Sequence, residues 1–412
     1  MKLPHPSRDR VLINASGFLR SLGFGFLGVV LGIYLFRTGH SSFQIGAIIA
    51  VGLAGSAAAT LFVSFAADRL GRRSSLIVLS LLSVIPALVL AFSPGLAVLL
   101  LAAFFGMLNG TGTDRSPTFV LDQAILPGLA PDSSRTWNLA LYNALLDGGG
   151  SLGALCSSLP LLLHDRFGSP LLSEYRTLFF AYAGLCLTVA AFYWFLSPAV
   201  EVATPLPAGR QTSPLAPGTK SVVARLTALF SLDAFGGGFL TDALVAYWFF
   251  RRFGMAERDL GLVFFAVHVL NAGSHLAAAG LAKRIGLVNT MVLTHLPSSL
   301  LLIAVPFAPS LRWALILFLC REALVEMDVP TRQSYVAAVV GASERTFAAG
   351  VTNLARNVFW AVGSAVGGFL MQAVSFSAPL VVGGGTKIFY DVLLYRSFRR
   401  LKPPEERPGT KG

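Results

Sequence analysis

Apolar runs of about twenty residues recur along the chain, and this feature restricts the possible fold more than any other. A helix of that length crosses a lipid bilayer, and every backbone polar group inside a bilayer needs a partner within the protein. The runs are continuous and do not alternate between polar and apolar residues, which favours helices over a β-barrel. Only 13% of the 412 residues are charged, whereas soluble domains contain about 25%. The sequence therefore predicts an all-α membrane protein.

The apolar runs predict about twelve spanning helices in two groups of six. Their expected ranges are 11–36, 43–67, 75–93, 96–125, 137–161, 176–197, 222–250, 259–282, 288–308, 311–336, 347–374 and 378–397. The segment between the groups, residues 197–220, is rich in Pro, Ala, Thr and Gly, which is typical of a flexible linker. We therefore expect an N-terminal half at 1–197, a cytoplasmic linker at 198–221, a C-terminal half at 222–397 and a cytoplasmic tail at 398–412.

The chain carries a formal net charge of +12. On a soluble domain this charge would indicate nucleic-acid binding, but here the basic residues flank the apolar runs and indicate orientation in a membrane. With the N-terminus placed in the cytoplasm, most basic residues fall in the inner loops. We therefore expect a monomer in the cell (inner) membrane, with both termini cytoplasmic, a lipid bilayer around it and no nucleic acid among its partners.

The sequence indicates neither an enzyme nor a bound cofactor or metal. Its three cysteines are too few and too scattered for a disulfide or zinc framework, and it contains no nucleophilic triad, paired zinc motif or phosphate-binding loop. The stretch GFGFLG at residues 23–28 fits a dinucleotide-binding pattern. That stretch lies inside a predicted spanning helix, where small residues instead favour close packing of helices.

The two halves of the sequence are related as repeats. Residues 15–36 match residues 228–249 at an offset of 213, which pairs Gly23 with Gly236 and Gly25 with Gly238. A second match, at an offset of 210, pairs Gly153 with Gly363; it also pairs Arg135 with Arg345 and Asn143 with Asn353. Parallel halves of six spans, with substrate bound at their interface, are a transporter architecture.

The stretch ADRLGRR, residues 67–73, concentrates charge between the second and third apolar runs. Its glycine permits a tight reversal of the chain, and its arginines favour the cytoplasmic side. Twelve spans, a central linker, duplicated halves and DRLGRR after the second span resemble the major facilitator superfamily, whose turn motif is Gly-x-x-x-Asp-Arg-x-Gly-Arg-Arg. The resemblance covers essentially the whole chain, with Ser64 at the leading glycine of the motif and Lys283 at the position of its acid in the second half.

The resemblance implies a secondary transporter whose charged turn closes the cytoplasmic side in one state. Asp68 is placed to meet the positive N-terminal end of a helix from the other half. Arg72 is placed to pair with an acid near the inner end of the fourth span, and Asp122 is the best candidate. A merely solvated group of charges is the alternative. The predicted cytoplasmic latch comprises Asp68, Arg69, Gly71, Arg72, Arg73 and Asp122.

The resemblance also implies that spans 1, 4, 7 and 10 line a central cavity, and a charge inside a membrane usually faces such a cavity and pairs. Arg20 on span 1 and Asp233 on span 7 are equivalent positions of the repeat. Opposite charges on pseudosymmetric helices predict a pair that faces the cavity. That pair is either a substrate or proton site or a structural tie between the halves.

Spans 4 and 10 supply the remaining predicted substrate or proton-coupling residues. Glu322 and Glu326 are four residues apart on one helix face, and two nearby carboxylates favour proton binding. For Asp114, Asp328 and Arg332 there is an alternative: these residues only form ion pairs between helices and take no part in transport. Pro117 and Pro330 allow these helices to bend. The residues predicted to carry transport chemistry are Arg20, Asp233, Glu322, Glu326, Asn109, Asp114 and Arg115.

Other polar residues in the spans give weaker indications. Asp147 and Asp242 are candidates to line the same path, and His268 and His275 share one helix face. A packed histidine bonded to a neighbour is the alternative for both histidines. Arg356, and the pair Lys387 and Asp391 at a spacing of four, are expected to form internal ion pairs.

The sequence predicts a proton-coupled secondary transporter of a small polar, zwitterionic or amphipathic solute. Carboxylates on spans 7 and 10 would carry the coupling, and Arg20 would act on substrate or on a gate. Two alternatives remain: a metal-cation exporter of the same fold that uses Glu322, Glu326, Asp233 and the histidines, and a membrane sensor of the same fold that does not transport. The sequence specifies neither the substrate nor the direction of transport.

Overall fold

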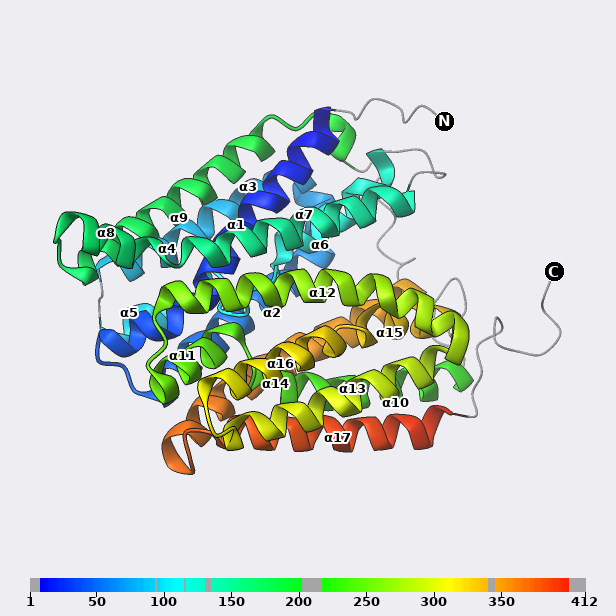
Figure 1. Ribbon diagram of the computed structural model, residues 1–412. Coiled ribbons are helices and arrows are strands. Elements are labelled where there is room, and N and C mark those ends of the chain that lie inside the picture. Colours follow the sequence, from blue (N-terminus) through cyan, green and yellow to red (C-terminus); the bar gives the residue numbers. More distant parts are fainter. Residues whose placement is uncertain are drawn as a thin grey trace. The chain divides into compact units, whose positions relative to one another are not determined.

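The computed structural model describes residues 8–92, 95–114, 116–129, 135–201, 217–339 and 345–399. Within these ranges every regular element is a helix (Figure 1), which confirms the predicted all-α fold class. Arg115 lies outside the described residues, and so do the side chains of Asp68, Arg69 and Lys283.

Each predicted span contains at least one helix. Eight spans are continuous: α1 (Arg8–Arg37), α2 (Ser42–Leu70), α7 (Arg135–Cys156), α9 (Leu171–Trp194), α12 (Glu257–Ile285), α13 (Leu287–Ala304), α16 (Arg345–Ala373) and α17 (Ala378–Phe398). Four are divided: α3 (Arg72–Leu82) with α4 (Val84–Phe92), α5 (Leu96–Phe105) with α6 (Pro117–Ile125), α10 (Pro217–Gly238) with α11 (Asp242–Phe253), and α14 (Leu311–Val325) with α15 (Asp328–Val339). The short helix α8 (Leu159–Phe167) follows α7.

The break between α5 and α6 shows how polar side chains interrupt an apolar span. The Asn109 side chain donates to the carbonyl of Thr113 at 2.6 Å and accepts from the backbone N–H of Thr111 at 2.8 Å, so it replaces helical hydrogen bonds. Helix α6 then begins with Ser116 as its N-cap, which accepts from the N–H of Phe119, and with Pro117 in the first turn. Asn109 therefore organises the backbone of this break.

Nine stretches of the described residues are long and apolar enough to cross a membrane. The predicted spans outside this set are 96–125, 311–336 and 378–397. The first two are divided into shorter helices, and the third carries Lys387, Asp391 and Arg396 inside one continuous helix.

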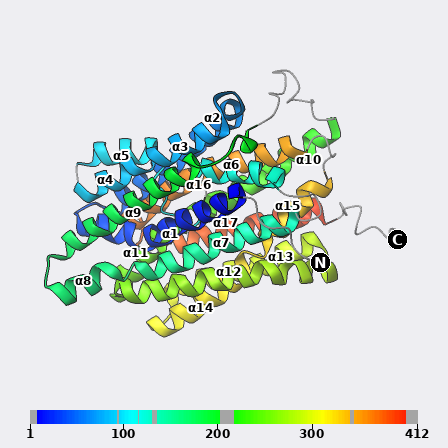
Figure 2. The same cartoon turned by 90° about the horizontal axis from the view of Figure 1, so that it is seen from above.

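Glycines set the closest helix contacts, as the sequence predicts for GFGFLG. Helix α1 packs mainly against α7, and α10 packs mainly against α16 (Figure 1, Figure 2). A Cβ added at Gly25 would lie 2.1 Å from the carbonyl oxygen of Gly150, and one at Gly238 would lie 2.8 Å from the Cα of Gly363. Gly25 and Gly238 are equivalent in the repeat, and the atom nearest to an added Cβ at Gly238 is the carbonyl oxygen of Trp360, at 2.4 Å, so both halves place a glycine against a backbone carbonyl.

The chain forms two compact units. Unit 1 comprises Met1–Pro205 and Thr241–His268, and unit 2 comprises Leu206–Leu240 and Val269–Gly412. Residues 241–268 therefore group with unit 1, although the sequence places them in the second half. The reason is local packing: α11 lies against α1, and the N–H of Ala243 donates to the carbonyl of Gly110 at 3.1 Å.

Candidate functional site

A buried ionic group lies inside unit 1, and we call it the Arg20 cluster: Arg20, Asp114, Asp122, Tyr142 and Tyr193. The Arg20 guanidinium donates to Asp114 Oδ2 at 2.7 Å, to Asp122 Oδ2 at 3.0 Å and to the Tyr142 hydroxyl at 3.0 Å. It also donates to the Tyr193 hydroxyl. One arginine on α1 thus joins the α5–α6 break, α6, α7 and α9.

The two tyrosines complete the hydrogen bonding of Asp122. Tyr142 donates to Asp122 Oδ2 at 2.8 Å, and Tyr193 donates to the same oxygen at 3.0 Å. Asp122 is fully buried, with 0% exposure. A buried charge is tolerated when its partners satisfy all of its hydrogen-bonding positions. In this cluster one guanidinium therefore pairs with both carboxylates, and neither acid lacks a partner.

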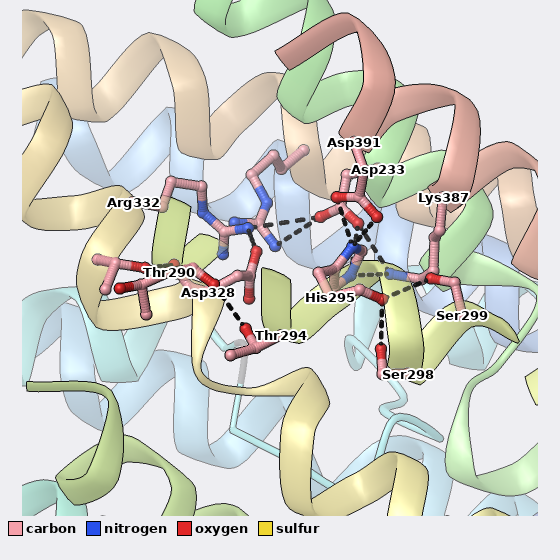
Figure 3. Close-up of polar contacts among 12 residues, drawn as sticks. Asp233, Thr290, Thr294, His295, Ser298, Ser299, Asp328, Arg332, Lys387 and Asp391 are labelled. Carbon is pink, nitrogen blue, oxygen red and sulfur yellow. Dashed lines mark hydrogen bonds and ion pairs between the residues drawn. The ribbon is translucent and has the colours of Figure 1, made fainter. Parts of the chain in front are cut away.

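A second buried ionic group lies inside unit 2 (Figure 3). We call it the Asp233 cluster: Asp233, His295, Asp328, Arg332, Arg356, Lys387 and Asp391. Asp233 on α10 accepts from Lys387 Nζ at 2.8 Å, and it faces Arg332 at 3.4 Å and Arg356 at 3.8 Å. Three cations from three other helices therefore converge on one carboxylate.

The remaining acids of the Asp233 cluster hold their own partners. Asp328 accepts from Arg332 at 2.6 Å on the same helix, α15. Asp391 on α17 lies 3.0 Å from Nδ1 of His295 on α13, and Lys387 Nζ lies 3.3 Å from Nε2 of the same imidazole. His295 therefore stands between the lysine and the second acid (Figure 3).

A third polar group, within unit 1, lies at the C-terminal end of α1. We call it the Glu257 group: Arg37, Tyr175 and Glu257. Arg37 donates to Glu257 Oε1 through Nε at 3.1 Å and Nη2 at 2.8 Å, and the Tyr175 hydroxyl donates to the same oxygen. Glu257, the first residue of α12, is 1% exposed. The ring of Phe250 on α11 lies 5.1 Å from the Arg37 guanidinium.

The sequence profile of the Major Facilitator Superfamily matches residues 13–358. The chain belongs to the Major Facilitator Superfamily. A relative from Saccharomyces cerevisiae, the uncharacterized membrane protein YJR124C, is 27% identical over 424 residues, which cover 96% of this chain and 95% of the relative. This superfamily protein is thus an integral membrane protein of a transporter family, which implies a non-enzymatic transporter.

Solved transporters share the fold of this superfamily protein. The nucleoside transporter NupG has a TM-score of 0.77 at 14% identity, covering 95% of this chain and 100% of its own. The xylose transporter XylE from E. coli, in an inward-open conformation, has a TM-score of 0.71 at 15% identity, covering 94% and 96%. A POT family transporter in complex with 5-aminolevulinic acid has a TM-score of 0.77 at 13% identity, covering 97% and 98%. At these identities the likeness shows the fold alone.

Arg20 and Asp233, the two residues that the sequence predicts as a pair, each carry several ionic partners from their own unit. Asp114 joins Arg20, and Arg356 joins Asp233. The repeat therefore places a charge at equivalent positions of α1 and α10 and surrounds each charge with a separate set of counter-ions.

The other predicted residues of span 10 have mostly local partners. Glu322 is buried and forms an ion pair with its neighbour Arg321. Glu326 is half-buried and follows the last residue of α14. The spacing of four predicts a direct ion pair between Lys387 and Asp391. Instead, the imidazole of His295 lies between them and contacts both side chains.

Asp122, which the sequence offers as the partner of Arg72, is held by Arg20, Tyr142 and Tyr193. Another acid, Glu201, contacts the backbone of the turn. Its carboxylate accepts from the backbone N–H of Arg72 at 2.7 Å and of Arg73 at 3.1 Å, at the N-terminus of α3, where an anion is favoured.

The turn before α3 needs a glycine. Gly71 adopts a φ of 92°, which favours glycine. The Arg73 side chain donates to the Trp194 carbonyl at 2.6 Å, so it ties the turn to the C-terminal end of α9. The Asp68 and Arg69 side chains of the predicted latch lie outside the described residues.

His268 and Asp242 approach one another within unit 1, but they do not form a hydrogen bond. His268 Nε2 lies 3.8 Å from Asp242 Oδ2, and His268 is buried. His275 is half-buried. Among the described residues, no group of three or more His, Cys, Asp or Glu side chains is placed to hold a metal ion.

Sequence reasoning missed five residues: Tyr175, Tyr193, Glu201, Glu257 and His295. His295 is the one ionisable residue of its apolar run at 287–304, and its importance depends on Asp391 and Lys387, which lie far along the chain. Tyr193 resembles an ordinary aromatic at a helix end. Glu201 and Glu257 fall in or beside connecting segments, where charge is expected. Tyr193 and His295 have one signal in common: a titratable side chain inside a largely apolar span.

Proposed function

We propose that this protein is a proton-coupled secondary active transporter that moves a small polar, zwitterionic or amphipathic solute by alternating access. The Asp233 cluster carries the proposal. It gathers seven ionisable side chains from five helices of a membrane protein. Each charge inside a bilayer costs about 2.5–3.5 kcal/mol on insertion scales, so such groups are retained mainly where they serve substrate or proton movement.

The Arg20 cluster supports a second role in the same machine. Arg20 binds residues of the α5–α6 break, and breaks in spanning helices are where transporters place substrate and ion sites. We assign Arg20 to substrate binding or to a gate in unit 1. Proton coupling belongs to the Asp233 cluster in unit 2.

The Glu257 group supports alternating access. It ties the end of α1, in the first half of the sequence, to the start of α12, in the second half. Both termini are proposed to be cytoplasmic, which puts the end of α1 on the outer side of the cell (inner) membrane. We assign the contact to an outer gate, which must open for the protein to face outward.

The metal-cation alternative is less well supported. Asp233, one of its proposed ligands, faces Lys387, Arg332 and Arg356, and three nearby cations repel a metal ion. Glu322 is paired with Arg321. Transport of an organic solute fits this environment better than transport of a metal.

The test is transport by purified protein in proteoliposomes with an imposed pH gradient. A thermal-shift screen selects probes first, because a ligand that binds the folded state stabilises it. The panel begins with a nucleoside, D-xylose and 5-aminolevulinic acid, the solutes named with the similar structures, and extends to amphipathic cations. The wild type should accumulate a probe along the gradient.

Asp233→Asn should abolish the accumulation, because it removes the carboxylate that three cations share. Asp259→Asn, at an exposed acid in the first turn of α12, is the matched control and should transport normally. Equal transport by Asp233→Asn and wild type contradicts the assigned site, and wild-type flux that ignores the gradient contradicts proton coupling. Binding without flux of any probe would favour the non-transporting sensor.

A further inference from the structure

We propose that His295 is the proton-binding residue of the Asp233 cluster, and that a hydrogen gained at its Nε2 exchanges Lys387 for His295 as the partner of Asp233. The inference rests on the proposed function, since it names the group that receives the coupling proton. The sequence offered carboxylates for this role. The geometry around the imidazole instead assigns it to a histidine buried between two acids and a lysine (Figure 3).

Asp391 fixes the tautomer of the neutral imidazole. Both oxygens of Asp391 lie within hydrogen-bond distance of His295 Nδ1, at 3.0 and 3.1 Å. An ionised carboxylate only accepts hydrogen bonds, so Nδ1 carries the hydrogen. Nε2 of the neutral ring is therefore bare and acts as an acceptor.

Nε2 lies between a cation and an anion. It is 3.3 Å from Lys387 Nζ and 3.6 Å from Asp233 Oδ1, while Lys387 donates to that same oxygen at 2.8 Å. In the neutral state, Lys387 donates to both Asp233 and Nε2. The three atoms form a triangle. Two sides of this triangle are favourable, because Lys387 donates to both partners, whereas the third side places two acceptors, Nε2 and Asp233 Oδ1, opposite each other.

A hydrogen on Nε2 reverses the two sides of this triangle that include Nε2. Nε2–H and the lysine ammonium are both donors and cannot bond to each other, whereas Nε2–H and Asp233 attract. The favourable contact of Nε2 therefore changes from Lys387 to Asp233, and Lys387 is displaced from its place beside the imidazole. If the proton instead crosses to Asp391, the imidazole takes up its other tautomer and Nε2 still carries a hydrogen, so the effect on Lys387 is the same.

The other charges around the imidazole favour this placement of the proton. Protonation of Asp233 would leave Lys387, Arg332 and Arg356 facing a neutral group. Arg332 is also paired with Asp328. The charged and titratable groups facing the cluster are Asp233 on α10, the Arg321–Glu322 pair and Glu326 at the end of α14, Asp328 and Arg332 on α15, Arg356 on α16, and Lys387, Tyr390 and Asp391 on α17.

Histidine-selective ¹⁵N labelling and NMR of the full chain in nanodiscs test the proposal directly. The nitrogen shifts of a histidine distinguish the bare, singly protonated and doubly protonated ring. His295→Gln identifies the His295 signals by their loss. In the wild type, Nε2 should gain a hydrogen as the pH is lowered from about 8 to about 5, the range in which histidine ordinarily changes charge.

Two variants test the partners. Lys387→Met removes the cation beside Nε2, so Nε2 should gain its hydrogen at a higher pH than in the wild type. Asp391→Asn removes the anion beside Nδ1, so protonation should require a lower pH. The signals of His164, which lies in unit 1 and contacts the Ser169 carbonyl, report that each variant remains folded.

An Nε2 that stays bare, or stays protonated, throughout this range overturns the proposal. So does a titration that Lys387→Met leaves unmoved, because Lys387 would then not be the group exchanged. The measurement needs no transported solute. A titrating His295 without proton-coupled flux would therefore contradict the proposed function alone, and coupled flux with an inert His295 would contradict this inference alone.

Discussion

Arg20 and Asp233 occupy equivalent positions of the two repeats with opposite charges, and the structure explains why both are tolerated. Each charge is buried, and each is surrounded by counter-ions from its own unit. In the Arg20 cluster two tyrosine hydroxyls make up the remaining hydrogen bonds, whereas in the Asp233 cluster a histidine and a second acid do so. The position is shared, but the chemistry has diverged.

Arg20 is predicted to be essential for the stability of unit 1. Arg20→Met leaves Asp114 and Asp122 buried without their cation, and removal of one partner of a buried pair costs about 3–5 kcal/mol. The variant should unfold at a clearly lower temperature than the wild type in the same detergent. Arg8→Met, at an exposed arginine of the same helix, is the control and should change little. Equal melting of Arg20→Met and wild type would show that the cluster contributes nothing to stability.

Single charges in apolar spans could be recognised from the sequence, but their partners could not. Arg20, Asp233, Lys387 and Asp391 stand out because a charge inside a membrane is costly. Which charges meet depends on helix rotation and on distant segments, so the expected Lys387–Asp391 pair is mediated by His295. A lone histidine is easily mistaken for a packed residue, and its role is visible only once three helices are in place.

At the scale of elements, apolar length predicted the positions of the spans, while the breaks within them were missed. The span at 96–125 is interrupted from Gly106 to Ser116, and the span at 222–250 is interrupted between Gly238 and Asp242. Apolar residues continue up to each break, so hydropathy alone does not mark it. The local signals are short-range: Asn109 forms a turn through its own side chain, and Met107 adopts a φ of 54°.

The contact between α1 and α7 is predicted to tolerate no side chain at Gly25. The Cβ of alanine would lie 2.1 Å from the carbonyl oxygen of Gly150, so the two backbones must separate, and overpacking typically costs about 1–3 kcal/mol. Gly25→Ala should lower the melting temperature. Gly184→Ala, in α9, is the matched control because an added Cβ there meets no atom within 4 Å. Similar melting of the two variants would show that α1 and α7 can separate without cost.

At the scale of the whole molecule, residues 241–268 link the two halves of the sequence. They follow α10 of unit 2 along the chain, yet they pack within unit 1 through α11 and the start of α12. The sequence predicted the division at the linker because composition changes there. It gave no indication of this grouping, since the contacts that produce it, such as Arg37 with Glu257, join residues 220 positions apart.

The Glu257 group is predicted to hold this end of unit 1 closed. Its contacts depend on the charge of Glu257, which accepts from Arg37 and Tyr175, so Glu257→Gln removes the ionic attraction while keeping the shape of the side chain. The closed state should then become less stable relative to states in which the contact is already broken. The reporter is a cysteine at Ala243, a residue of α11 with 0% exposure, in a background from which Cys156, Cys186 and Cys320 have been replaced.

A membrane-impermeable maleimide should label this cysteine slowly in the reference protein and several-fold faster with Glu257→Gln. Arg37→Gln should have a similar effect, because it removes the other member of the same ion pair. Asp259→Asn, in the same helical turn but exposed, controls for a general loss of negative charge and should leave the labelling rate unchanged. If labelling is equally slow in all four proteins, the ion pair does not govern access, and packing of the aromatic residues of α11 against α1 alone keeps this end closed.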